Sequence, residues 1–217
     1  MGEILVTMVG GMLLALLFNR MTRSFGLMRA FVFVPKYVAM SSAAVVFLWI
    51  LNTDSGVLNY LLQCIGLPAV DWLNQQSTAL PSVLMLTGWR VIGYGMMIYL
   101  SAMMGISQEY YEAASLDGAN GVQKFFRITL PLLSPTTLFL LVTTFLSSMK
   151  VFQSVDILTS GGPARSTEVF VYLIYRYAMV DFRMDRAATA AVMFFLILLV
   201  ITVLTMKVSD RSVTYDS

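Results

Sequence analysis

The sequence predicts an all-α polytopic membrane protein, and three observations lead to this class. Of its 217 residues, 58% are hydrophobic and only 12% are charged, whereas a soluble domain carries about 25% charged residues. The mean hydropathy is +0.78. The charges are also bunched, which leaves stretches close to or above the roughly 18 apolar residues typical of a spanning helix. We therefore expect one membrane domain over residues 1–217 with about five transmembrane helices.

The composition also argues against several functional classes. A net charge of +2 is too small to indicate nucleic-acid binding. The chain has no histidine, the usual metal ligand and general base. Its single cysteine, Cys64, cannot form an internal disulfide and leaves no cysteine-based metal site. We expect no catalytic residue, no metal and no cofactor.

Five hydrophobic segments are expected to be the spanning helices. They cover residues 4–18, 30–51, 80–106, 135–158 and 187–206. The first has fifteen residues and would reach only roughly 22 Å, less than the ~30 Å hydrocarbon core of a bilayer. This short reach leads us to expect a further helix upstream of the first segment.

Basic residues predict the orientation of these segments in the membrane. Arg20, Arg23 and Arg29 lie in the first connection and Lys36 just beyond it, while residues 52–79 contain none. The first connection is therefore expected to be cytoplasmic and the second external. Alternation then places 107–134 and 207–217 in the cytoplasm and 159–186 outside. The last external connection carries four arginines, which departs from the rule, and an external N-terminus again favours a missing upstream helix.

The external connection 159–186 contains an apolar run that is too short to span. Ser166 or Thr167 is a suitable N-cap, and Glu168 follows in the first turn. Apolar residues from Val169 to Tyr177 share one helical face. We expect an interfacial or re-entrant helix here, preceded by a glycine-containing turn.

The cytoplasmic connection, residues 107–134, is predicted to be a helical hairpin. Ser107 can cap a first helix that ends near Leu116, and Gly118 supplies a left-handed residue after it. Asn120 and Gln123 have the spacing of a capping box for a second helix.

Prolines are predicted to delimit the rest of this connection. Pro131 should stop the second helix, and Ser134 should cap the next one with Pro135 at its first position. Both ends of the hairpin are thus tied to spanning helices. It could transmit a force from the cytoplasm, or it could be a plain connector; caps alone do not decide between these readings.

The same stretch contains Glu112-Ala113-Ala114, then Gly118 after three residues, then Ile128, Leu130 and Pro131. This spacing resembles the EAA signature of permease subunits of binding-protein-dependent ABC importers. The similarity extends to the carbohydrate and glycerol-phosphate branch over nearly the whole chain. It is carried by the stretches "ALLFNR", "RAFVFVP", "GLPAVDWL", "LTSGGPARSTEVFVYLIYRYA" and "RAATAAVMFFLILL".

The resemblance implies a six-helix permease that moves a sugar or sugar-like solute into the cytoplasm of a bacterial or archaeal cell. These seven signature residues would form the coupling helix region that docks on an ATPase. The expected partners are a second permease subunit, two ATP-binding-cassette ATPases and an external substrate-binding protein. The chain lacks G-x-x-x-x-G-K-[ST], so ATP hydrolysis is expected in a separate chain. A transporter or channel driven by an ion gradient is the alternative class, and a membrane scaffold is a third.

Ionisable residues inside predicted spans are candidates for the substrate pathway. Arg90 lies about ten residues into its segment, and Lys150 and Asp156 share a later one. Phe152 and Gln153, beside Lys150, are the aromatic and hydrogen-bonding groups that suit a sugar. An ion pair between Arg90 and Asp156, or a structural role for either, stays open. Lys36, by contrast, is expected to snorkel to the membrane interface or to form a structural pair.

Overall fold

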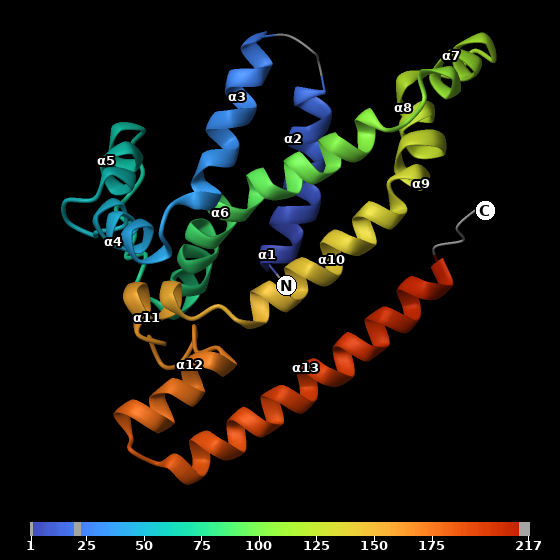
Figure 1. The fold of residues 1–217 in the computed structure, drawn as a ribbon. Helices are drawn as coiled ribbons and strands as arrows, with labels where there is room; N and C mark the ends of the chain where they lie inside the picture. The colour runs from blue at the N-terminus through green and yellow to red at the C-terminus, as the bar shows by residue number, and fades with distance from the viewer. Residues whose placement is uncertain (1, 20–22, 213–217) are drawn as a thin grey trace.

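The computed structural model of the chain describes residues 2–19 and 23–212 (Figure 1). Helices account for the regular structure of this part, and it contains no strand, which confirms the predicted all-α class. Arg20 and the end of the tail, which the charge rule placed in the cytoplasm, lie outside the described residues. The N-terminal half contains α1 (Gly2–Leu5), η1 (Val6–Gly10), α2 (Gly11–Phe18), α3 (Arg23–Phe33), η2 (Val34–Tyr37), α4 (Met40–Ile50), α5 (Val57–Cys64) and α6 (Gln76–Met104).

The second half begins with the predicted cytoplasmic hairpin and ends with a long helix. Its elements are α7 (Gln108–Leu116), α8 (Gly121–Lys124), η3 (Phe125–Thr129), α9 (Leu130–Leu132), α10 (Ser134–Met149), α11 (Gln153–Thr159), α12 (Phe170–Tyr175), η4 (Arg176–Val180) and α13 (Met184–Ser212). By length and composition, α6 and the part of α13 from Met184 to Val203 can each cross a membrane. These two match predicted spans 80–106 and 187–206.

Helix α6 lies at the centre of the fold and packs along the continuous N-terminal helix α1–η1–α2 (Figure 1). Small residues allow this close approach. A Cβ on Gly11 would lie 2.8 Å from the carbonyl carbon of Gly95, and one on Gly95 would collide with the carbonyl oxygen of Thr7. Small residues at such crossings are what lets helix backbones pack tightly in a membrane.

The predicted span 30–51 is wrong as a single helix. The helical stretch Gly26–Tyr37 and helix α4 meet at an angle of 103°. Val38 and Ala39 between them have extended backbone, with ψ of 132° at both. Pro35 explains why the first helix loses its regular ladder, because proline donates no backbone hydrogen bond and crowds the preceding turn.

The predicted span 135–158 is also broken. Helix α10 ends at Met149 with Lys150 as its C-cap, and Phe152 has φ −135° and ψ −64° before α11 begins. Lys150 and Asp156 therefore lie on two different helices, contrary to the sequence prediction. The break coincides with polar residues, Lys150, Gln153 and Ser154, inside an otherwise apolar segment.

Two predicted caps are wrong. Leu133, which has no capping side chain, is the N-cap of α10, and Pro131 lies within α9 instead of ending it. Pro131 is the penultimate residue of the continuous helical stretch Gly121–Leu132 and follows the π-helical turn η3, a local irregularity of the backbone ladder that can accommodate a proline. The helix Gly121–Leu132 then meets α10 at 61°.

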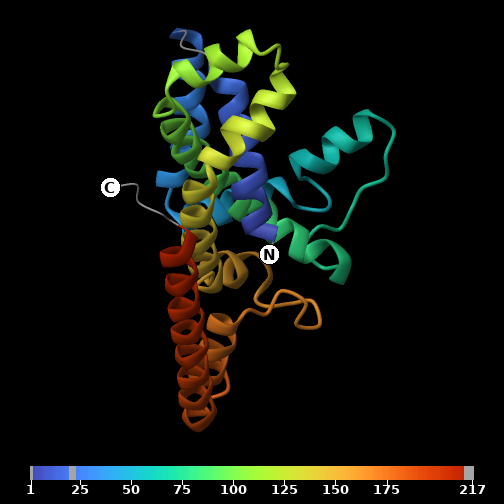
Figure 2. The ribbon, with the colours of Figure 1, turned by 90° about the vertical axis from the view of Figure 1, so that its right-hand side faces the viewer.

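Helix α12, which the sequence predicts to be external, begins later than predicted. Its N-cap is Val169, without a side-chain hydrogen bond. The Thr167 hydroxyl lies 2.8 Å from the carbonyl oxygen of Gly162 and 2.7 Å from the Thr159 hydroxyl, so it holds the preceding turn instead. Helix α12 and η4 run beside the start of α13, where Phe170 and Phe194 stack with centroids 5.6 Å apart (Figure 2).

Candidate transport cavity and coupling hairpin

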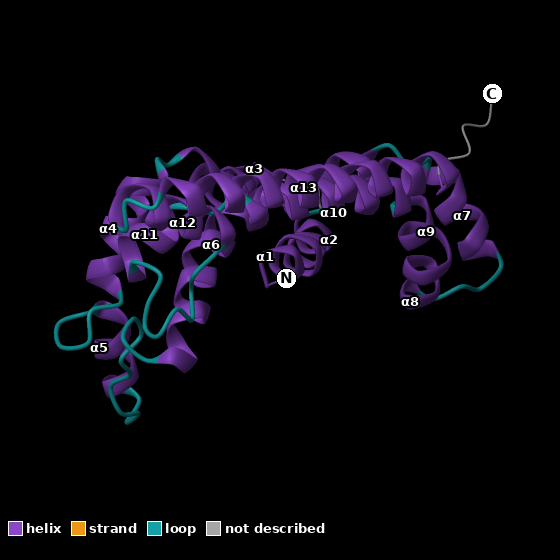
Figure 3. Cartoon of the chain, turned by 90° about the horizontal axis from the view of Figure 1, so that it is seen from below, coloured by secondary structure: helices purple, strands orange, loops and turns teal. Residues whose placement is uncertain are grey.

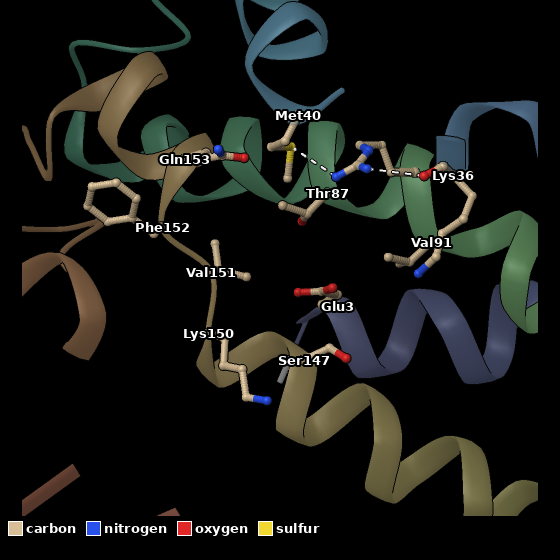
Figure 4. Close-up of a pocket in the computed structure, with 11 residues that line it drawn as sticks. Glu3, Lys36, Met40, Thr87, Val91, Ser147, Lys150, Val151, Phe152 and Gln153 are labelled. Carbon is tan, nitrogen blue, oxygen red and sulfur yellow. Dashed lines mark hydrogen bonds between the residues drawn. The ribbon is translucent and has the colours of Figure 1, made fainter. Parts of the chain in front are cut away.

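A cavity of about 440 Å³ opens where the two broken helices approach α6 and the start of α1 (Figure 4). Its walls come from both breaks and from the helices on either side of them. The lining residues are Glu3, Lys36, Met40, Thr87, Arg90, Val91, Ser147, Lys150, Val151, Phe152 and Gln153. The breaks thus place irregular backbone around a cavity, which is where a membrane protein tolerates it.

The cavity brings together four of the five residues predicted for a substrate pathway. Arg90, Lys150, Phe152 and Gln153 all line it. Asp156 does not, and it lies half-buried on α11, one turn beyond Gln153. The sequence left their proximity open, because Arg90 is sixty residues from Lys150 in the chain.

Arg90 is held by the first helix break and not by Asp156. Its Nη2 donates to the Lys36 carbonyl oxygen at 3.1 Å, and its Nη1 lies 3.3 Å from Met40 Sδ (Figure 4). No carboxylate oxygen comes within 4.0 Å of Arg90 among the described residues. Arg90 therefore ties α6 to both sides of the bend between η2 and α4.

Two cavity residues were missed or misplaced by the sequence reasoning. Glu3 is only 6% exposed and lines the cavity; the signal was an acidic residue immediately before an apolar run. Lys36 was expected to snorkel or to pair structurally, not to line a cavity; it does line the cavity, and its Nζ lies 4.6 Å from the ring centroid of Tyr94. This distance suits a cation–π contact.

A smaller cavity of about 100 Å³ lies next to the first and shares four of its residues. The shared residues are Glu3, Lys36, Val91 and Ser147, and the others are Thr7, Tyr94, Thr143 and Thr144. Hydroxyl groups from η1, α6 and α10 thus continue the polar lining between the helices.

The first two helices of the predicted coupling hairpin, residues 107–134, have the caps that the sequence predicts. The Ser107 hydroxyl accepts from the Glu109 N–H at 3.4 Å, and α7 ends at Leu116. Gly118 has a φ of +74°. The backbone N–H of Asn120 and of Gln123 each donate to the other's side-chain oxygen at 2.9 Å, which completes the capping box.

Polar contacts hold the two arms of the hairpin together. The hydroxyls of Tyr111 and Thr129 lie 2.9 Å apart, and Lys124 Nζ donates to the Ser115 hydroxyl at 2.6 Å. Glu112, Ala113, Gly118 and Pro131 are exposed, whereas Ala114, Ile128 and Leu130 are partly buried. The predicted signature residues thus divide between an outer surface and the internal packing of the hairpin.

The outer surface of the hairpin also carries large apolar side chains that the motif does not include. Leu116 is 91% exposed, and Tyr110, Val122 and Phe126 are exposed as well. The hairpin projects at the opposite end of the molecule from α4, α5 and α11 (Figure 3). Helices α6 and α10 connect it to the region of the cavity.

Comparison with known proteins places this architecture in a family. A family model described as "Binding-protein-dependent transport system inner membrane component" matches residues 7–215. The probable ABC transporter permease protein YurN of Bacillus subtilis is 35% identical, over 94% of this chain and 72% of its own length. The sn-glycerol-3-phosphate transport system permease protein UgpA of Agrobacterium fabrum is 32% identical, over 97% of this chain and 72% of its own length.

Solved structures show the same relationship. A chain of a bacterial ABC transporter involved in the import of the acidic polysaccharide alginate superimposes with a TM-score of 0.84 and 27% identity. The match covers 97% of this chain and 77% of that one. A second structure, the alginate transporter in complex with an alginate pentasaccharide-bound periplasmic protein, gives 0.83 and 29%. This chain therefore belongs to the inner membrane components of binding-protein-dependent transport systems, the permease subunits of ABC importers.

Proposed function

We propose that this permease moves a sugar or sugar-like solute through the cavity, driven by a separate ATPase that binds the coupling hairpin. The observation that carries the proposal is the connection between the two sites. The hairpin follows α6 directly and leads directly into α10, and both helices contribute lining residues to the cavity. A displacement of the hairpin would therefore reach the cavity walls through two helices.

The coupling surface would be the exposed side of the hairpin. Glu112 offers a charge, Ala113 and Ala114 keep α7 flat, and Gly118 leaves open space beside the turn, with no atom within 4 Å of a Cβ built there. Ile128, Leu130 and Pro131 would hold the second arm against the first. The exposed Leu116 would supply apolar contact area to the ATPase.

The solute would contact the residues at the second helix break. Phe152 forms an aromatic cluster with Tyr172 and Tyr175, at centroid distances of 6.1 and 4.9 Å. Gln153, the next residue along the chain, also lines the cavity (Figure 4). An aromatic wall and a few placed polar groups are the usual lining of a small-molecule site. Asp156, one turn along α11, would face the approach to the cavity.

The proposed assembly contains a second permease, two ATP-binding-cassette ATPases and an external substrate-binding protein. The homologous transporter in complex with its periplasmic protein supports the last of these. Helix α13 exposes apolar side chains along its length, including Val192, Phe195 and Leu199, and these would contact lipid or the second permease. ATP hydrolysis would belong to the ATPase subunits.

The test replaces Gly118 by valine. The residue has φ +74°, where a Cβ costs about 1–2 kcal/mol, and valine would also fill the open space beside the turn. Gly66→Val is the matched control, because Gly66 has φ +79°, is equally open, and lies on the connection before α6. We expect Gly118→Val to insert normally, lose most ATPase co-purification and stop ATP-dependent uptake, while Gly66→Val keeps the ATPase.

Two results would contradict the coupling role. If Gly118→Val retains both the ATPase and uptake at the wild-type level, the hairpin is a plain connector. Equal loss of the ATPase from both variants would instead attribute the effect to general backbone strain. Glu112→Lys, which adds no backbone strain, should reduce ATPase binding more mildly.

A further inference from the structure

The large cavity carries an unbalanced set of charges. Glu3 is the one acidic residue among its lining side chains, and Lys36, Arg90 and Lys150 are the basic ones. The formal excess is two positive charges. Elementary electrostatics requires such a cluster, on helices that lie in a membrane, to be compensated by counter-charge or by water.

The described part of the protein does not supply this compensation through ion pairs. Its three ion pairs all involve Glu168 or Asp181 in the external connection. Lys150 is exposed at the end of α10, with no carboxylate oxygen within 4.0 Å among the described residues. Arg90 donates to neutral acceptors, the Lys36 carbonyl and Met40 Sδ, and Glu3 in the same cavity is the one carboxylate there that attracts both Arg90 and Lys36.

The backbone contributes both signs at the cavity. Helix α10 ends at Lys150 in the cavity wall, so its C-terminus brings a partial negative charge, whereas α4 begins there and brings a partial positive one. Met40, which lines the cavity, is the first residue of α4, and no side chain caps this helix. The N-terminus of a helix of this length carries a partial positive charge and unpaired N–H groups. The bend held by Arg90 therefore directs this positive end toward the region where the basic side chains gather.

We propose that the cavity selects solutes that carry an anionic group, a phosphate or a carboxylate on the sugar. Lys150 and Lys36 would contact that group, while Phe152 and Gln153 would contact the sugar ring. Arg90 would hold the bend in place, and its positive charge would attract the anionic group without contacting it directly. This inference rests on the proposed transport function and names the chemical class of its solute.

The cavity potential can be measured without knowing the solute. In a Cys64→Ala background, Gln153→Cys places a reporter thiol in the cavity of the solubilised importer complex. Its labelling rates with anionic sulfonatoethyl and cationic trimethylammonioethyl methanethiosulfonate are compared. The ratio of the two rates cancels any change in thiolate fraction. The native Cys64, exposed and outside the cavity, provides the reference ratio.

The expected ratio of anionic to cationic labelling is about tenfold or more above that of Cys64. A unit charge about 8 Å away in an effective dielectric of about 60 changes each rate about threefold, and the ratio about tenfold. Lys150→Gln should therefore lower the ratio about tenfold. Lys207→Gln, exposed on α13 and outside the cavity, is the matched control and should leave the ratio unchanged.

A ratio equal to that of Cys64, or one insensitive to Lys150→Gln, would overturn the anionic class. Ser147→Cys gives a second reporter on the opposite wall in case Gln153→Cys does not assemble. ATP-dependent uptake by reconstituted wild-type complex, with sn-glycerol 3-phosphate, a short oligouronate and neutral glycerol as probes, is read separately. ATP-dependent uptake of neutral glycerol alone would reject the anionic class while leaving the transport function intact.

Discussion

Leu116→Ala should weaken ATPase binding strongly without affecting the stability of the permease. Leu116 is 91% exposed at the end of α7, so the fold gains little from its side chain. Full burial against a partner would be worth about 0.8 kcal/mol for each of the three carbons that alanine lacks, or about 2.4 kcal/mol. This corresponds to an increase of about 50-fold in the dissociation constant of the ATPase.

The assay is titration of purified ATPase onto solubilised permease complex, with thermal stability measured on the same preparations. Leu67→Ala is the matched control, because Leu67 is 50% exposed and lies on the connection before α6, at the end remote from the hairpin. Its dissociation constant should match the wild type. If Leu116→Ala binds within threefold of the wild type while remaining folded, Leu116 is not buried by the ATPase and the proposed contact surface is misplaced.

Three further changes test other parts of the structure. Asn59 is 1% exposed and makes four hydrogen bonds that hold the connection before α6. Asn59→Leu should therefore lower the free energy of unfolding by about 3 kcal/mol or more and speed amide hydrogen exchange in residues 53–72. Unchanged exchange would contradict this role. Arg176→Gln should leave the mostly buried carboxylate of Glu168, 2.6 Å from the guanidinium, without its partner and lower the free energy of unfolding by about 3–5 kcal/mol. Adding Glu168→Gln should partly restore the melting temperature. Absence of this rescue would show that the pair is not coupled. Gly93→Leu should abolish folded permease in size-exclusion chromatography, because its Cβ would collide with the Val32 carbonyl; normal elution would mean that α3 can move aside.

The parts of the structure that the sequence predicted well are those decided over a few residues. The Ser107 cap, the left-handed Gly118 and the Asn120–Gln123 box each depend on neighbours within one turn. Thr167 was locally just as suitable as a cap, yet its hydroxyl bonds five residues back to Gly162. A local signal fails there because a tertiary turn competes for the same group.

The two helix breaks could not be predicted from hydropathy. Each lies in a segment that is apolar on average and is interrupted by only a few residues, Pro35 and Lys36 at the first break and Lys150 and Gln153 at the second. What stabilises the first break is the Arg90 guanidinium, which donates to Lys36 from 54 residues away. The cavity was predictable only as a set of unusual residues. Arg90, Lys150, Phe152 and Gln153 stood out by their chemistry, but only the fold brings them to one place and adds Glu3.

The glycine crossing between the N-terminal helix and α6 makes α6 a lever with unequal arms. Gly95 is pressed against Thr7 and Gly11, so the helices cannot slide freely at this point and α6 has a fulcrum there. The arm toward the hairpin, from Gly95 to Met104, is about 14 Å long, and the arm to Gln76 is about 28 Å. A rigid rotation that moves the hairpin end by about 2 Å would therefore swing the other end by about 4 Å in the opposite direction. Arg90, only five residues from this pivot point, would move little. The bend that Arg90 holds would therefore keep its position relative to α6 while the two ends of α6 move in opposite directions.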